Sequence, residues 1–266
     1  MEILQKWLFI LAGSALRYLL FAVSAYLFFY VWKRNRYSHL RIQQKFPPTR
    51  AIRTELRYSL STLFIFSIII CCTILTARKG YTRMYFHLRD HSLIYFAGSV
   101  VLIILLHDTY FYWTHRLMHQ KRIFRYVHRV HHLSHNPTPL AAFAFHPIEA
   151  VIEAGIVPVI AWVIPAHPLA LAITGLYMIL TNVMGHLGYE LFPKSFVRNK
   201  WLNWQNTSTH HNMHHHYNKH NYGLYFNWWD RLMGTNHPRY YEEFRGREGK
   251  DLSLTEEGAL FTEKAD

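Results

Sequence analysis

Histidine gathers in two dense blocks of this chain, and its spacing there suggests metal binding. The 266 residues include 20 histidines. The block at 115–137, HRLMHQKRIFRYVHRVHHLSHNP, holds an H-x-x-x-H pair and an H-x-x-H-H set, and the block at 209–220, THHNMHHHYNKH, repeats the H-x-x-H-H spacing. Residues three and four apart share one face of a helix, so each set can present imidazoles in one direction. Neutral imidazole is a common ligand of iron, zinc, copper and nickel.

The number of histidines at these spacings predicts a site for two metal ions. Eight of them are too many for one ion and about right for two. They are His115, His119, His128, His131, His132, His211, His214 and His215. His186 ends an apolar stretch and is expected to join them. A histidine-rich tract can also bind metal loosely, sense pH or lie at a lipid interface, but the repeated spacing favours a built site.

Two acidic residues have spacings that relate them to this site. Asp108 precedes His115 by seven residues, almost two helical turns, and so shares its face. Its carboxylate could orient an imidazole by accepting the free N–H, or could make a buried structural hydrogen bond. Glu190 follows His186 by four residues and could be a further ligand, a partner of an imidazole or a solvated residue.

Five apolar stretches are long enough to position these residues at a membrane. We expect spans at about 7–32, 58–77, 92–113, 148–165 and 168–186, each near the length that crosses a hydrocarbon core. The last two, separated by PAHP, form a tight hairpin that either spans or dips into the bilayer. The first is too long for a signal peptide and is expected to be retained. The chain is predicted to be an all-α, multi-pass transmembrane bundle with a cytoplasmic helical cap that holds the metal site.

Charge predicts which side of the membrane carries the histidines. The formal net charge is +13, and residues 33–57 are dense in Lys and Arg, which is typical of a cytoplasmic loop. If that loop is cytoplasmic, the number of membrane crossings that follow it places both histidine blocks on the cytoplasmic face. Because topology accounts for the positive charge, no nucleic-acid partner is expected. Cys71 and Cys72 are adjacent within an apolar span and form no cysteine-based metal motif.

Four segments resemble the fatty acid hydroxylase/sterol desaturase superfamily of membrane-bound non-haem di-iron enzymes. They are HDTYFYWTHRLMH, HRVHHLSHNP, AFAFHPIEA and HHNMHHHYNKHNYGLYFNWWDRLMGT. The block PTPLAAFAFHPIEA and the NYG…WDRLMGT ending are most similar to the sterol C5-desaturase branch. The resemblance implies a catalytic domain at 95–240, preceded by transmembrane helices and a basic loop at 1–94 and followed by a charged tail at 241–266.

The resemblance also implies roles for particular residues. It implies iron ligation by all nine histidines named above, His186 included, and it puts His146 near the site without making it a ligand. In the fatty acid 2-hydroxylase branch a further histidine stands where this chain has Glu190. Residues 229–231 would close the C-terminal part over the site. Histidines without a counterpart are His107, His135, His210, His216 and His220.

The implied activity is O2-dependent hydroxylation or desaturation of an unactivated C–H position in a sterol-like or fatty-acyl lipid. The lipid would enter from the bilayer, and electrons would come from NAD(P)H through a separate donor of cytochrome b5 or ferredoxin type, since no HPGG motif occurs. An H-E-x-x-H zinc peptidase motif is also absent. The alternative is a histidine-rich membrane metal-binding or transport protein without redox catalysis. Either a bacterial inner membrane or the endoplasmic reticulum would suit the chain.

Overall fold

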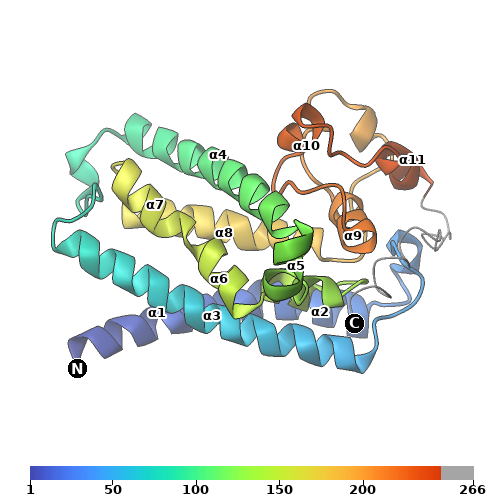
Figure 1. Cartoon of the computed structure of the whole chain (residues 1–266), viewed down its shortest axis with the longest axis horizontal. Helices are drawn as coiled ribbons and strands as arrows, with labels where there is room; N and C mark the ends of the chain where they lie inside the picture. The colour runs from blue at the N-terminus through green and yellow to red at the C-terminus, as the bar shows by residue number, and fades with distance from the viewer. Residues whose placement is uncertain (247–266) are drawn as a thin grey trace.

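The computed structural model of this chain describes residues 1–246, and helices joined by loops make up this part of the chain (Figure 1). Within that range, the extended pairings are two isolated bridges, Arg41 with Tyr189 and Gln205 with Phe226. The all-α prediction is therefore confirmed. Most of the predicted charged tail lies outside the described residues.

Four helices in the described part are long and apolar enough to cross a membrane. The first begins as α1 (Glu2–Tyr18) and continues through α2 (Ser24–Tyr26) to Trp32. The others are α3 (Thr49–Arg78), α4 (Leu93–Met118) and α8 (Pro168–Gly185). Local sequence signals set several of these ends: Ser92 caps α4 through its side chain, and Pro168 occupies the first turn of α8. Four of the five predicted spans are thus present as helices.

The predicted span at 148–165 is wrong as a single helix. The structure has two short helices there, α6 (Pro147–Ala154) and α7 (Ile156–Val163). Gly155 separates them, and Pro158 cannot donate the backbone hydrogen bond that would continue the first helix into the second. The broken pair extends from the end of the bundle opposite the short covering helices towards its middle (Figure 1). At its far end the Ala161 carbonyl accepts a hydrogen bond from the Arg83 amide.

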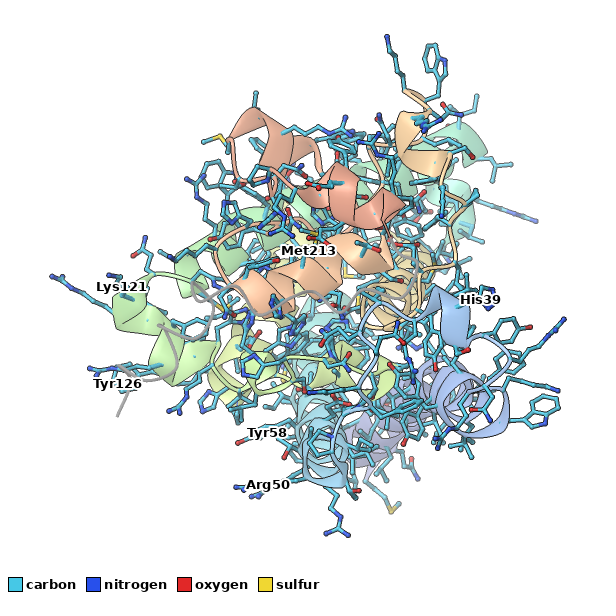
Figure 2. All side chains as sticks on the ribbon, turned by 90° about the vertical axis from the view of Figure 1, so that its right-hand side faces the viewer. His39, Arg50, Tyr58, Lys121, Tyr126 and Met213 are labelled. Carbon is cyan, nitrogen blue, oxygen red and sulfur yellow. The ribbon has the colours of Figure 1, made fainter. Side chains whose placement is uncertain are left out.

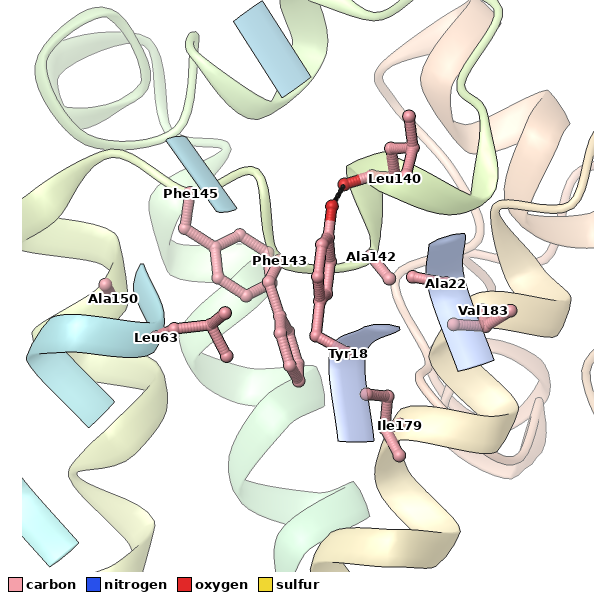
Figure 3. Packing of buried hydrophobic residues seen from close by; sticks show 10 residues of the cluster. All are labelled: Tyr18, Ala22, Leu63, Leu140, Ala142, Phe143, Phe145, Ala150, Ile179 and Val183. Carbon is pink, nitrogen blue, oxygen red and sulfur yellow. Dashed lines mark hydrogen bonds between the residues drawn. The ribbon is translucent and has the colours of Figure 1, made fainter. Parts of the chain in front are cut away.

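A buried cluster joins the first and third helices to the segment that follows the first histidine block. Tyr18, Leu63 and Phe143 pack together in it, and the Tyr18 hydroxyl donates to the Leu140 carbonyl at 2.8 Å (Figure 3). The Ser59 hydroxyl donates to the same carbonyl, also at 2.8 Å. This core anchors the chain just after His128–His132 to two long helices.

Short helices cover one end of the bundle. They are α5 (Lys121–Val127), α9 (Ser208–Tyr217), α10 (Trp228–Leu232) and α11 (Tyr240–Arg245). Figure 1 shows them together at the end where α4 and α8 finish and α3 begins. Both histidine blocks lie in or beside these helices, so the predicted meeting of the blocks at one end is confirmed.

Candidate metal centre

The nine histidines predicted as ligands come together in two groups. The five-histidine group consists of His115, His119, His128, His132 and His214. The four-histidine group consists of His131, His186, His211 and His215. Within each group, one ring nitrogen per residue lies within 4.8 Å of every other. All nine side chains are buried except His119, which is partly buried.

Four helices and a short 3-10 turn supply these side chains or lie directly before them. His115 lies in the last turn of α4 and His119 directly follows that helix, while His186 directly follows α8. His211, His214 and His215 project from α9. His128 ends α5, and His131 and His132 lie in a short 3-10 turn just after it. Figure 2 looks onto this end of the molecule, where α9 with Met213 lies across the middle.

Each H-x-x-H-H set contributes to both groups. The adjacent residues His131 and His132 belong to different groups, and so do His214 and His215. The rings of His132 and His215, one from each group, have centroids 4.9 Å apart. The doubled histidine therefore ties the two groups together, and loosening either set would disturb both.

Hydrogen bonds to carbonyl oxygens determine which ring nitrogen carries the proton. Nδ1 of His115 lies 2.8 Å from the Tyr222 carbonyl, and Nδ1 of His214 lies 2.7 Å from the His220 carbonyl. Nδ1 of His186 lies 2.8 Å from the Asn182 carbonyl. A carbonyl oxygen only accepts, so each Nδ1 is the N–H donor and, in the neutral ring, each Nε2 keeps a free lone pair.

These free Nε2 atoms converge. Nε2 of His115 lies 3.0 Å from Nε2 of His128, and Nε2 of His186 lies 3.0 Å from Nε2 of His211. Nitrogens bound to one ion at about 2.0–2.1 Å and at right angles would be about 3 Å apart. Lone pairs facing one another at this distance repel unless a cation lies between them.

Burial keeps these rings neutral and therefore available as ligands. It lowers the pKa of His128, His132, His211 and His214 well below the ordinary value, and neighbouring imidazoles lower it further. A protonated imidazole cannot bind metal at that nitrogen, so a depressed pKa favours ligation at neutral pH. The all-nitrogen donor set suits a first-row transition metal. The residues present thus fit the metal ions that the resemblance implies.

Glu149 is a functional residue that the sequence prediction missed. Its Oε1 lies 2.6 Å from Nδ1 of His128, and both side chains are buried. Glu149 accepts a hydrogen bond from the Nδ1–H of His128, which leaves Nε2 of that ring free for a metal. The available signal was a carboxylate three residues after His146 in an otherwise apolar segment. His146 instead caps α6, accepting a hydrogen bond from the Ile148 amide, and belongs to neither group.

Asp108 and Glu190 contact backbone amides. Oδ1 of Asp108 accepts hydrogen bonds from the amides of Tyr225 at 2.8 Å and Phe226 at 3.2 Å. Of the two roles predicted for Asp108, the structure thus shows the buried structural hydrogen bond and not the orientation of an imidazole. Glu190 is buried and accepts from the amide of Thr209 at 2.9 Å, at the start of α9. A carboxylate there satisfies an unpaired helix N–H and complements the helix dipole.

The loop after α9 closes over the five-histidine group. The Asp230 carboxylate accepts from the amides of Tyr222 and Gly223, each at 2.8 Å. Since the Tyr222 carbonyl holds His115, Asp230 acts on that ring through the loop. Two of the remaining histidines have other partners: His107 bonds to the Tyr225 hydroxyl and His210 to Asn236. His135, His216 and His220 also belong to neither group.

Comparison with known proteins identifies the family. A family model described as fatty acid hydroxylase matches residues 100–235, about half of the chain and a range that includes all nine histidines. The chain belongs to this family. No solved structure matches it. As a member of the fatty acid hydroxylase family, the chain is a membrane lipid oxidoreductase, and the predicted resemblance is confirmed.

Several curated relatives of this fatty acid hydroxylase family member are named as sterol enzymes. A Delta(7)-sterol 5(6)-desaturase of Gibberella zeae is 28% identical over 224 residues, covering 84% of this chain and 65% of the relative. Lathosterol oxidase of Rattus norvegicus is 27% identical over 235 residues, covering 86% and 74%. C-4 methylsterol oxidase of Schizosaccharomyces pombe is 35% identical over 154 residues, covering 56% and 50%.

Proposed function

We propose that the chain is a di-iron, O2-dependent enzyme that hydroxylates or desaturates an unactivated C–H position of a sterol-like or fatty-acyl lipid. The observation that carries this proposal is the convergence of nine imidazoles, eight of them buried and one partly buried, into two groups whose ring nitrogens lie close together. The names of the relatives make sterols the first substrate class to test. The nine histidines lie at one end of the bundle, in the last turn of a long helix or beyond, and not midway along the long helices, which speaks against a transport site.

Iron bound in the two groups would supply the oxidising power that acid–base side chains lack. The protein would bind the metals through the five- and four-histidine groups and hold each ring in one tautomer. Glu149 does this for His128, and the carbonyls of Tyr222, His220 and Asn182 do it for three further rings. Burial of the rings would keep bulk water from the reacting position.

The proposed reaction needs an external source of electrons. Hydroxylation consumes the C–H compound, one O2, two electrons and two protons, and yields an alcohol and one water. Desaturation consumes the same and yields an alkene and two waters. The chain itself holds no source of these electrons in its described residues, so we assign them to NAD(P)H through a separate donor of cytochrome b5 or ferredoxin type.

The metal centre is proposed to lie on the cytoplasmic side of the membrane. The basic segment 33–57 joins the first long helix to α3 at the same end of the bundle as both histidine groups (Figure 1). Lys- and Arg-rich loops of this kind are typically cytoplasmic. A lipid could then reach the site sideways from the bilayer while a soluble donor approaches from the cytoplasm. The membrane would be a bacterial inner membrane or the endoplasmic reticulum.

Metal analysis of matched variants tests this proposal. The protein would be purified in mild detergent under iron-replete conditions beside His131→Ala, His214→Ala and His135→Ala. His131 and His214 belong to different groups, whereas His135 is exposed and belongs to neither. We expect about two irons per chain in the wild type and in His135→Ala, and clear loss in the other two.

A substrate assay would follow with the iron-loaded protein. Lathosterol and a long-chain fatty acyl lipid would be incubated with O2, NAD(P)H and a reconstituted donor, and the products identified by mass spectrometry. Oxygen-dependent formation of an alcohol or alkene, absent from His131→Ala, would support the proposal. Metal content indifferent to both ligand changes would contradict it.

A further inference from the structure

A basic surface lies directly beside the five-histidine group. The helix α5 is the segment between His119 and His128, and its outer side carries cations. We call this surface the α5 basic face; its exposed residues are Lys121, Arg122, Arg125, Tyr126 and Arg129. The sequence has no acidic residue between Asp108 and Glu149. No described residue forms an ion pair with Arg122, Arg125 or Arg129, so their charges are free to act on a partner.

A ring on α5 links this face to the histidines. The inward side of α5 carries Phe124, whose ring centroid lies 5.4 Å from that of His119 and 5.5 Å from that of His132. His119 is also the one partly exposed member of the nine. The α5 basic face is therefore a place where a protein on the surface would come close to the five-histidine group.

We propose that the α5 basic face is the docking surface for an acidic electron-transfer protein. This rests on the proposed redox function, because it names the route by which that function receives electrons. Opposite charge on the two surfaces would raise the encounter rate and orient the donor. Each encounter would pass one electron inward past Phe124, leaving the donor oxidised by one electron. Two encounters would supply the two electrons of one turnover.

A second basic surface at the same end of the molecule provides a matched control. Arg50 and Arg53, in the first turn of α3, are exposed and three residues apart, as are Arg122 and Arg125. Figure 2 shows Arg50 at the lower edge of this end, well away from Lys121 and Tyr126, which project from one flank. Charge reversal of either pair changes the net charge by the same amount, so only location differs.

Binding of purified donors tests the proposal. The full-length protein would be placed in nanodiscs of phosphatidylcholine, and its affinity measured for a soluble cytochrome b5 domain and for a [2Fe–2S] ferredoxin. We expect Arg122→Glu with Arg125→Glu to weaken binding of the productive donor at least tenfold, and Arg50→Glu with Arg53→Glu to change it less than threefold. Arg122→Gln with Arg125→Gln should fall between. Metal content, unchanged in every variant, would show that the site remains folded.

Three results would overturn the docking proposal. Equal weakening by both reversed pairs would indicate a general effect of net charge and would overturn the proposal, as would binding of neither donor by the wild type. If α5 reversal altered behaviour only in nanodiscs containing phosphatidylserine, the face would contact lipid headgroups and the proposal would fall. The protein could also bind a donor through α5 and yet oxidise no lipid. That result would support the docking surface and reject the proposed function.

Discussion

Oε1 of Glu149 lies 2.6 Å from Nδ1 of His128, although 21 residues separate the two in the chain. Glu149 lies in the first turn of α6, which begins at Pro147 after the cap His146, and His128 directly follows α5. Acceptance of an imidazole N–H by a carboxylate fixes the ring and strengthens its other nitrogen as a metal ligand.

Glu149→Gln should weaken metal binding while leaving the shape of the site nearly unchanged. An amide accepts the His128 N–H less strongly, and loss of such a partner typically lowers metal affinity about 10–100-fold. Competition with a coloured chelator would measure the change. The control is Glu153→Gln, one turn further along α6, where the carboxylate is also buried but has no imidazole partner among the described residues. Equal effects of the two substitutions would contradict the assigned role.

Gly188→Ala should destabilise the protein strongly. Gly188 has a φ of +71°, and a Cβ there would lie 2.2 Å from the Tyr30 hydroxyl and 3.3 Å from the Pro137 carbonyl. We expect the free energy of unfolding to fall by about 2–4 kcal/mol, since backbone strain and steric clash act together. Gly80 has a similar φ of +80° but open space around it, so Gly80→Ala should cost only about 1 kcal/mol. Thermal unfolding in detergent, followed by intrinsic fluorescence, would show whether the two melting temperatures differ as expected.

Glu190→Ala should loosen α9 and thereby the histidines on it. The buried amide of Thr209 would lose its acceptor, at a cost of about 1–3 kcal/mol. Glu190→Gln should cost less, because an amide oxygen can still accept that bond. The measurements are the melting temperature and the rate at which a chelator strips the metal. Glu243→Gln, which alters a partly exposed pair with Arg239, serves as the control. A Glu190→Ala protein as stable as this control would refute the anchoring role.

Acid should destabilise the protein partly through His237. Burial lowers the pKa of His237 from 6.5 to about 4, and its Nδ1 accepts a hydrogen bond from the Arg239 amide at 3.2 Å. Between these two pH values the unfolded chain binds a proton that the folded chain does not, so stability falls as pH falls from 6.5 towards 4. His237→Asn keeps an acceptor but cannot titrate, and should flatten the decline in melting temperature over that window. A decline as steep in His237→Asn as in the wild type would contradict this assignment.

Local pattern was sufficient to predict most of the long helices and the histidines that gather at the site. Hydropathy located the long helices because membrane-length apolar runs are a property of contiguous sequence. The H-x-x-x-H pair and the two H-x-x-H-H sets predicted eight of the nine histidines that meet at one end, because residues three and four apart share a helix face whatever surrounds them. His186 was predicted from its place at the end of an apolar stretch and from the family resemblance. The break of 148–165 at Gly155 was missed, since apolar content alone does not register a glycine and a proline that interrupt a helix.

The sequence by itself determined which residues can bind metal and that they belong at one end of a membrane bundle. Only the tertiary structure decided how they divide, with His131 and His132 assigned to different groups although they are neighbours in the chain. It also decided that Glu149 supports His128, while Asp108 and Glu190 hold backbone amides. The reason is physical: these contacts join separate helices, and their geometry follows from how the helices pack and not from spacing along any one of them.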